Sequence, residues 1–359
     1  EQRIISFGIL ENIELLSLLN SPDQSKFNPI KLKVSTDVFG VNPNINFGKG
    51  LKMKIDFKNI IGVGSFGKVY DATNIDTRDD KKYVVKVQEM PSELDKKPIF
   101  KKEIEILQKV GELKSSICGG MIGSFEDEDN GDNGIYYILM DKYERDLFDY
   151  SEQNEIGIEN VKKIMEQLIY GISLLHDNQI WHRDLKPENI MLRDSAKFEI
   201  ALIDYGLSKE VKVDPKSGRQ RTNTYGGTTA YMSPEMLLIV QDYTSNIDWW
   251  STAMILFKLL TKKEFMDNAL QSGSSEHHYR KFLKKFKETY SHKLREIWLD
   301  SFLLEKQDEL FRNISQEIDE IKKLFKLLMT LGETSIIDKT LKKKDFIIPF
   351  IKKYLLKFI

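Results

Sequence analysis

The chain has 359 residues, 41% of them hydrophobic, so it is long and apolar enough to bury the core of one large domain or of two ordinary ones. Its 54 Lys and Arg residues nearly balance 55 Asp and Glu residues, and the net charge of -1 predicts neither nucleic acid nor an anionic membrane as a partner. The single cysteine, Cys118, excludes an internal disulfide framework and indicates a reducing, cytoplasmic environment.

Residues 1–50 have their own pattern, an apolar segment at 9–19 followed by turn-forming residues through Gly50, and predict an appended N-terminal extension. The chain opens with charged residues and no long apolar run, so no signal peptide is expected. The most hydrophobic stretch, 249–260, is shorter than the ~20 residues that a bilayer span needs. It predicts a buried core helix and no membrane span.

Strands are predicted first along the chain, and helices later. Apolar and polar residues alternate from 51 to 57 and a β-rich run continues to 72, which predicts two strands joined by a glycine turn. Residues 83–87 form a short β-branched run and predict a further strand. Proline near the start and glycine after the end frame a helix at 98–110. Apolar residues at helical spacing predict another helix over 161–175, directly before a polar cluster.

Gly62, Gly64 and Gly67 form a Gly-x-Gly-x-x-Gly motif between two predicted strands. Without side chains, backbone amides can approach phosphate oxygens closely. A plain glycine-bearing hairpin is the alternative, and dinucleotide-binding folds share the motif, but there a helix follows the glycines. Here Lys68, Val69 and Tyr70 continue a strand, which favours a hairpin over a nucleotide.

Lys86 closes the apolar run of the next strand. Taken alone, it is equally compatible with a surface lysine whose stem is buried. Phosphate binding by a strand lysine requires a carboxylate that holds its ammonium group in place. Glu103 and Glu105 are two residues apart and therefore lie on different faces of the predicted helix. Ile99 and Leu107 define the inward stripe, so we select Glu103.

The string His-Arg-Asp-Leu-Lys-Pro-Glu-Asn at 182–189 resembles the catalytic loop of eukaryotic protein kinases, in the form typical of the serine/threonine branch. The resemblance implies that Asp184 accepts the proton of the substrate hydroxyl and that Lys186 steadies the transferred phosphoryl group. It also implies that Asn189 ligates Mg²⁺. A chance polar loop is the alternative, but five reactive residue types would then have to fall in family order.

Asp204-Tyr205-Gly206 follows an apolar run at 200–203 and resembles the Asp-Phe-Gly metal motif, which makes Asp204 the main Mg²⁺ ligand. An isolated aspartate at a strand end is more often a turn former, but its spacing after Asn189 favours the metal. Ser233-Pro234-Glu235 resembles the end of an activation segment, and Gly227-Thr228 resembles the substrate-docking loop. Asp248 resembles the aspartate that holds the backbone of the catalytic loop.

The resemblance implies an ATP site between the lobes with a hinge near residues 140–143. Its expected lining residues are the glycine-loop positions, Lys86 and the following set: Ser65, Phe66, Val69, Val84, Met140, Asp141, Tyr143, Asp146 and Met191. Val84 departs from the family, which usually carries alanine above the adenine ring. Lys339 stands where the family has an arginine to pair with Glu235, and as a lysine it loses the bidentate contact.

We predict that phosphorylation of Thr224 activates the protein. Arg183 beside a catalytic aspartate needs an anionic partner, commonly a phosphate on the activation segment, and Lys209 can add a second positive charge. Thr224 lies four residues before Thr228, which matches the activating threonine of the cyclic-nucleotide-dependent branch, loosely resembled here. The alternative is a solvated loop threonine in a segment ordered without phosphate.

The prediction is an α+β, bilobal protein kinase fold. An N-terminal extension (1–50) precedes the kinase domain (51–350), with an N-lobe at about 51–140, a C-lobe at about 144–350 and a tail at 351–359. ATP and Mg²⁺ are the expected cofactors. The expected partners are protein substrates with Ser or Thr acceptors and an upstream activating kinase. A pseudokinase scaffold or a component of a larger assembly is the alternative. Apolar stripes within 279–328 favour core packing over a partner surface. The oligomeric state stays open.

Overall fold

The computed structural model describes residues 44–48, 50–64, 67–76, 81–89, 97–127, 134–212, 227–228, 230–233, 236, 243 and 245–264. The chain divides into two compact units. The first holds the described residues up to Ile104 together with Met121–Lys142, and the second holds Glu105–Gly120 and the described residues from Tyr143 onward. The apolar stripes predicted within 279–328, Lys339 and the predicted tail lie outside the described residues.

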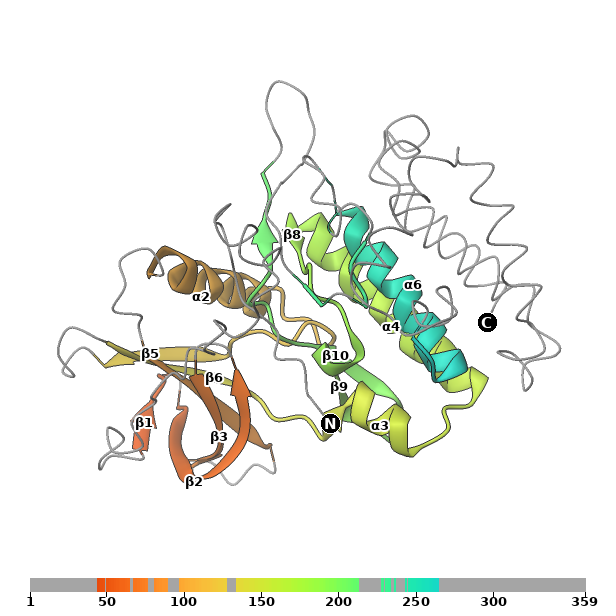
Figure 1. The fold of residues 1–359 in the computed structure, drawn as a ribbon. Helices are drawn as coiled ribbons and strands as arrows, with labels where there is room; N and C mark the ends of the chain where they lie inside the picture. The colour runs from red at the N-terminus through yellow and green to blue at the C-terminus, as the bar shows by residue number, and fades with distance from the viewer. Residues whose placement is uncertain are drawn as a thin grey trace, which may run out of the picture. The chain divides into compact units, whose positions relative to one another are not determined.

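The first unit contains a six-stranded antiparallel sheet (Figure 1) in the order β1-β2-β3-β4-β6-β5. Its strands are β1 Asn44–Asn46, β2 Lys52–Gly64, β3 Gly67–Asn74, β4 Tyr83–Glu89, β5 Gly123–Asp127 and β6 Ile135–Asp141. The strands predicted from residue 51 to residue 72 and at 83–87 are confirmed. The β2 and β3 strands form the glycine hairpin, because Gly64 pairs with Gly67.

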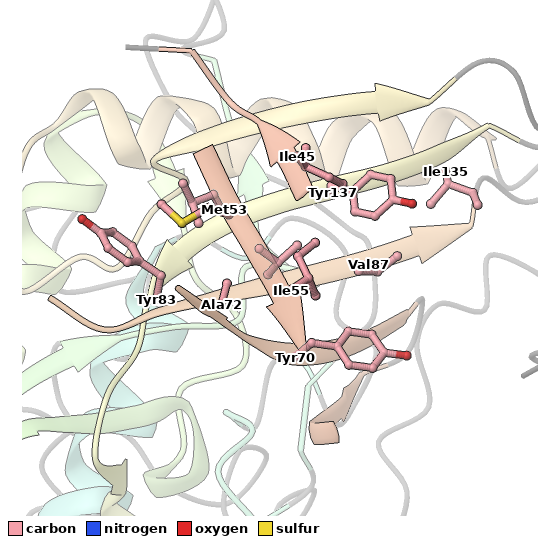
Figure 2. Close-up of a cluster of buried hydrophobic side chains, with 11 residues drawn as sticks. Ile45, Met53, Ile55, Tyr70, Ala72, Tyr83, Val87, Ile135 and Tyr137 are labelled. Carbon is pink, nitrogen blue, oxygen red and sulfur yellow. The ribbon is translucent and has the colours of Figure 1, made fainter. Parts of the chain in front are cut away.

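One face of this sheet packs a hydrophobic core, drawn in Figure 2. In β4, Tyr83, Val85 and Val87 belong to that core. Because successive side chains of a strand point to opposite faces, Val84, Lys86 and Gln88 lie on the other face. The sheet therefore separates an apolar side that stabilises the unit from a side that carries polar groups.

The kinase domain was predicted to start at residue 51, but the first strand of the sheet already starts at Asn44. Strand β1 pairs with β2, with Asn44 opposite Lys54 and Asn46 opposite Lys52. Ile45 is buried in the core of the sheet. The described end of the predicted N-terminal extension is thus part of the sheet. The sequence did not reveal this strand, because three residues are too few to show a periodic pattern.

Helix α2 (Lys97–Glu112) confirms the helix predicted at 98–110 and crosses the division between the units. The segment after it belongs to the second unit rather than to the continuous N-lobe predicted at about 51–140. The reason is backbone pairing: Leu202 N donates to Ile117 O (2.6 Å) and Gly119 N donates to Leu202 O (2.8 Å). The chain returns to the first unit at Met121 and enters the second unit again at Tyr143.

The described part of the second unit is built on helices α3 (Leu147–Gln153), α4 (Ile158–Asp177) and α6 (Asn246–Thr261). Helices α4 and α6 lie side by side (Figure 1). They confirm the helices predicted at 161–175 and 249–260. Helix α6 is almost entirely buried, as expected for a helix that is apolar on all sides. Among the described helices, none is both long and apolar enough to cross a bilayer.

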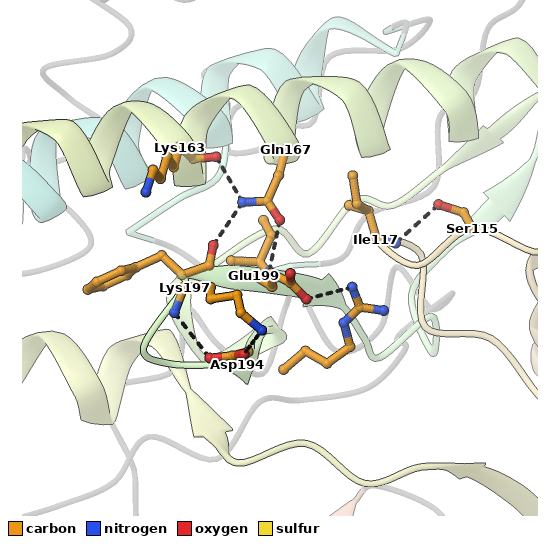
Figure 3. A network of polar contacts seen from close by, with 10 residues as sticks. Ser115, Ile117, Lys163, Gln167, Asp194, Lys197 and Glu199 are labelled. Carbon is orange, nitrogen blue, oxygen red and sulfur yellow. Dashed lines mark hydrogen bonds and ion pairs between the residues drawn. The ribbon is translucent and has the colours of Figure 1, made fainter. Parts of the chain in front are cut away.

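Short strands and a 3-10 turn complete the second unit: β7 Arg145–Asp146, β8 Ile180–Trp181, η2 Pro187–Asn189, β9 Ile190–Asp194, β10 Glu199–Leu202 and β11 Lys209–Glu210. Figure 3 shows how Gln167 of α4 holds the β9–β10 hairpin. Its Nε2 donates to Phe198 O (2.8 Å), and its Oε1 accepts from Ile200 N (3.1 Å). The hairpin is therefore fixed against the helix that leads into the polar cluster at 182–189.

Candidate active site

Lys86 and Glu103 form an ion pair in the first unit. Lys86 Nζ lies 2.6 Å from Glu103 Oε1, and the two side chains are 14% and 3% exposed. The alternative Glu105 is exposed. Because Lys86 lies on the sheet face opposite the hydrophobic core and is held by a buried carboxylate, its ammonium group has a defined position from which it can bind an anion. The surface-lysine alternative does not fit this burial.

The glycines of the β2–β3 hairpin differ in what the fold requires of them. A Cβ on Gly67 would lie 2.1 Å from Val87 O, so close packing against β4 requires a glycine there. A Cβ on Gly62 would lie 3.7 Å from the Val69 side chain, an ordinary contact. Packing therefore does not explain Gly62, which is consistent with close approach of a ligand to the backbone. Ser65 and Phe66 lie outside the described residues.

Most of the other predicted nucleotide residues of the first unit lie on the sheet face of Lys86. Val69 lies opposite Lys86, and Val84 lies opposite Met140. Asp141 alternates to the other face, where its carboxylate forms an ion pair with Lys81 (2.8 Å). The structure thus gathers Val69, Val84, Lys86 and Met140 on one surface and turns the Asp141 side chain away from it.

The catalytic-loop motif follows β8 directly, includes η2 and is anchored by Asp248 of α6. Asp248 is fully buried. Its Oδ2 accepts from His182 N (3.0 Å) and its Oδ1 from Arg183 N (2.8 Å). His176 Nε2 lies 2.8 Å from Oδ2. Burial by itself raises the pKa of Asp248, but the hydrogen bond and charge of His176, with His182 and the Arg183 amide, lower that pKa overall.

The carboxylate of Asp184 is surrounded by hydrogen-bond donors. Thr228 Oγ1 donates to Asp184 Oδ1 (2.8 Å), and Asn189 Nδ2 donates to Oδ2 (3.1 Å). Lys186 Nζ lies 3.1 Å from Oδ2 and 2.9 Å from Thr228 Oγ1, to which it donates. All four residues are in the second unit. The carboxylate thus already accepts a hydrogen bond from a threonine hydroxyl, with a lysine ammonium bonded to the same hydroxyl oxygen.

The two predicted metal ligands lie at the same end of one hairpin. Asn189 immediately precedes β9 and Asp204 follows β10 by two residues, while Ile190 pairs with Leu202. Ile203 N also donates to Asn189 O (3.0 Å). Asn189 Nδ2 donates to Asp184 O, so the side-chain oxygen of Asn189 is left as a ligand atom. The Asp204 side chain is exposed. Antiparallel pairing therefore places the two residues at the same end of the hairpin.

These oxygen donors fit a magnesium ion. Mg²⁺ prefers oxygen ligands and is usually held by one or two protein groups together with the phosphates of a substrate. The described residues contain no cluster of three or more His, Cys, Asp or Glu side chains of the kind that holds a metal by itself. A pair of oxygen donors completed by phosphate oxygens is the arrangement that the donor set supports.

Backbone strain coincides with the two motifs. Arg183 and Asp204 both have positive φ values, 70° and 62°, in the left-handed region that residues with a side chain seldom adopt. Gly227 has φ 125°, and a Cβ there would lie 2.8 Å from Arg183 O. The loop bearing Thr228 therefore approaches the catalytic-loop motif closely only because residue 227 is a glycine.

Three further predicted nucleotide residues are in the second unit. Asp146 pairs with Met191 across β7 and β9, so these two are brought together. Asp146 also caps α3, since its Oδ1 accepts from Asp149 N (2.7 Å), and burial raises the pKa of its carboxyl. Tyr143 contacts the backbone segment at Gly119, where a Cβ would lie 2.6 Å from the tyrosine oxygen.

The predicted regulatory residues are described only in part. Arg183 is buried, and Lys209 in β11 pairs with Trp181 of β8, two residues before Arg183. The two basic residues therefore lie on neighbouring segments. Thr224, Thr222, Thr229, Pro234 and Glu235 lie outside the described residues.

The hydrogen bonds of two residues, Thr228 and His176, were not predicted from the sequence. Thr228 was matched to a docking loop, but its bonds to Asp184 and Lys186 were not predicted. His176 was not considered as a partner of Asp248, although a histidine in the last turn of a helix directly before the catalytic motif was a usable signal.

The family model described as the protein kinase domain matches residues 55–335. Serine/threonine-protein kinase SCH9 of Saccharomyces cerevisiae is 34% identical over 210 residues, which cover 56% of this chain and 23% of that protein. SCH9 of Candida albicans is 33% identical over 238 residues, 64% of this chain and 28% of that protein. Serine/threonine-protein kinase Sgk1 of Danio rerio is 31% identical over 268 residues, 72% of this chain and 55% of Sgk1. The chain spans about a quarter to a half of the length of these relatives.

Proposed function

Because this chain belongs to the protein kinase domain family, we propose that it is an ATP-dependent serine/threonine protein kinase. The observation that carries the proposal is the environment of Asp184: a buried carboxylate bonded to a lysine, an asparagine and the hydroxyl of a threonine. A group that accepts a hydrogen bond from one threonine hydroxyl is suited to accept the proton of another. The names of the relatives support the same choice of acceptor.

In the proposed reaction, the oxygen of a substrate serine or threonine attacks the γ-phosphorus of ATP. The bond between this phosphorus and the β,γ-bridging oxygen breaks, ADP leaves, and Asp184 takes the hydroxyl proton. Lys186 neutralises negative charge on the transferred phosphoryl group from its position beside Asp184. Thr228 and Asn189 orient the carboxylate by donating to its two oxygens.

Protein kinases use ATP with Mg²⁺. Asn189 and Asp204 would hold the ion through their side-chain oxygens, and the ion supplies positive charge that offsets the phosphates when it is bound. The exposure of the Asp204 carboxylate is consistent with this role, because a bound ion would have access to it.

In the first unit, Lys86 would bind the α- and β-phosphates, and Gly62–Gly67 of the hairpin would cover them. The ion pair with Glu103 supports this assignment, because it holds the ammonium group on the sheet face of Val69, Val84 and Met140. The side chains of Val69, Val84 and Met140 would provide an apolar surface for a purine base. Tyr143, Asp146 and Met191 of the second unit stay proposed nucleotide-binding residues, on the strength of the family resemblance alone.

Replacement of Lys86 with Met tests the proposal, and a pseudokinase scaffold is its alternative. Wild-type protein should transfer labelled γ-phosphate to a generic basic protein in the presence of Mg²⁺. Lys86→Met should lower that rate about a hundredfold, because one preorganised contact to the phosphates is lost. Asp204→Ala should lower the rate by a similar factor, because a proposed ligand of Mg²⁺ is lost.

The control is Lys101→Met, an exposed lysine of the same helix that carries Glu103, which should retain the wild-type rate. Circular dichroism and the Tm establish that each variant is folded. Wild-type protein that binds ATP and Mg²⁺ but transfers no phosphate would support the scaffold instead. Near wild-type transfer by Lys86→Met would contradict the assignment of the lysine.

We also propose that phosphorylation of Thr224 activates the enzyme. A phosphate carries about -1.5 to -2 charges at neutral pH and can make one to three charge-assisted hydrogen bonds. Arg183 and Lys209, on neighbouring segments, are the basic residues that would receive it. Phosphatase treatment should therefore lower the activity about tenfold or more, and Thr224→Ala should make the enzyme insensitive to the phosphatase.

The control for this experiment is Thr222→Ala, two residues away, which should respond to phosphatase as wild type does. An active enzyme whose rate is unchanged by phosphatase and by Thr224→Ala would exclude the switch. Protein substrates, an upstream activating kinase and a cytoplasmic location remain proposals of the same kind.

A further inference from the structure

Tyr205 is a buried tyrosine next to the proposed metal ligand Asp204. It is 1% exposed, and its hydroxyl donates a hydrogen bond to Leu202 O (3.2 Å). The chain has tyrosine here where the Asp-Phe-Gly motif has phenylalanine, so the hydroxyl is a group that the motif itself does not require. A buried hydroxyl destabilises a protein unless it is bonded. The partner of this hydroxyl therefore indicates what the additional oxygen does.

The hydrogen bond of Tyr205 closes a short loop of backbone. It joins the side chain of residue 205 to the carbonyl of residue 202, and Asp204 lies between the two. Asp204 has a φ of 62°, in the left-handed region that is unfavourable for a residue with a side chain. Such a conformation persists only when the surrounding structure fixes it. The Tyr205 hydroxyl spans the strained residue and is therefore one of the groups that fix it.

Both ends of this loop are held by other groups. Leu202 N donates to Ile117 O (2.6 Å), and Leu202 O accepts from Gly119 N (2.8 Å). A carbonyl oxygen has two lone pairs, so Leu202 O can accept from Gly119 and Tyr205 together. The Tyr205 ring packs against the ring of His182, with 5.2 Å between the centroids. All of these residues belong to the second unit, so the hydroxyl ties Tyr205 to a carbonyl whose position is already fixed.

We propose that Tyr205 is a positioning residue for the metal site: its hydroxyl holds the backbone of Asp204 in the conformation that presents the carboxylate to Mg²⁺. This role rests on the proposed function, because it takes Asp204 to be a ligand of the ion. Gly206 N donates to Asp204 Oδ1 (3.3 Å) and orients the carboxylate within the same segment. Without the hydroxyl, Asp204 would be in the binding conformation for a smaller fraction of the time, which raises the apparent Kd for the ion accordingly.

Tyr205→Phe separates positioning from packing. Phenylalanine fills the same space as tyrosine without the oxygen, and Leu202 O keeps its hydrogen bond from Gly119 N. No buried acceptor is left unpaired, so the variant should fold. If Tyr205 only fills space, the variant behaves as wild type. If Tyr205 positions Asp204, the backbone around residue 204 loosens and the metal binds more weakly.

Two measurements on the full chain compare Tyr205→Phe with wild type. Hydrogen–deuterium exchange without nucleotide or metal should show the amides of residues 203–206 exchanging about 3- to 10-fold faster in the variant, the factor expected for the loss of one hydrogen bond. Mn²⁺, which like Mg²⁺ prefers oxygen ligands, is the metal probe and is followed by electron paramagnetic resonance in the presence of ADP. Its Kd should rise by a similar factor, while the Kd for ADP without metal stays unchanged.

Tyr137→Phe is the matched control, because Tyr137 is a buried tyrosine in the core of the first unit. It should change neither the exchange at 203–206 nor the Kd for Mn²⁺. Both effects are required of Tyr205→Phe, and the absence of either would overturn the positioning role while leaving the kinase proposal intact. A wild-type protein that binds no Mn²⁺ in the presence of ADP would instead refute the proposed metal site, and the role of Tyr205 with it.

Discussion

Replacing Asp184 with Asn is expected to lower kcat by about two to four orders of magnitude, the usual contribution of a positioned general base. Asparagine has the shape of aspartate but cannot take a proton at neutral pH. Its oxygen can still accept from Thr228, whereas its amide group would face the donors Lys186 and Asn189. The Kd for ATP should change little, because no phosphate contact is assigned to Asp184.

The measurement is single-turnover transfer of labelled γ-phosphate, which separates the chemical step from product release. Asp177→Asn is the matched control, because Asp177 is an exposed aspartate at the end of α4. It should leave the rate unchanged. An Asp184→Asn variant that binds ATP and retains more than about a tenth of the wild-type rate would exclude Asp184 as the general base.

Replacing Asp248 with Ala is expected to lower the free energy of unfolding by about 3–5 kcal/mol and to abolish activity with it. The buried carboxylate accepts from two backbone amides and lies beside His176. Alanine leaves these groups unpaired in the interior, and removing one partner of a buried network costs more than the network itself contributes. The backbone of the catalytic loop would lose its anchor to α6.

Urea denaturation followed by circular dichroism measures the change, with Asp177→Ala as the control. Asp248→Asn should lower the free energy of unfolding by less than Asp248→Ala does, because the asparagine oxygen can still accept from Arg183 N. The pH dependence provides a second readout. Because the pKa of Asp248 is lowered in the folded state, its contribution is complete above the unfolded value of about 3.9 and is lost as the pH falls through the folded value. In Asp248→Ala, this pH-dependent part of the free energy of unfolding should be absent. If Asp248→Ala lowers the free energy of unfolding by less than about 1 kcal/mol, the anchoring role is wrong.

Short-range features of this chain could be read from its sequence. Period-two alternation predicted the strands before residue 72, and helical spacing predicted the helices at 161–175 and 249–260, because each pattern arises within a single element. The string at 182–189 identified the family for the same reason: the loop carries its reactive residues consecutively. The choice of Glu103 over Glu105 also followed from local geometry, since the two lie on different helix faces.

Long-range contacts could not be read in this way. Asp248 reaches a loop 65 residues earlier, a contact that only the resemblance to a family predicted, and Thr228 reaches Asp184 over 44 residues. Such pairings depend on how helices and turns pack, for which one sequence has no periodic signal. The pairing of Leu202 with residues 117 and 119 likewise assigned 105–120 to the second unit. The sequence therefore determined which groups are present, while tertiary packing decided which of them meet.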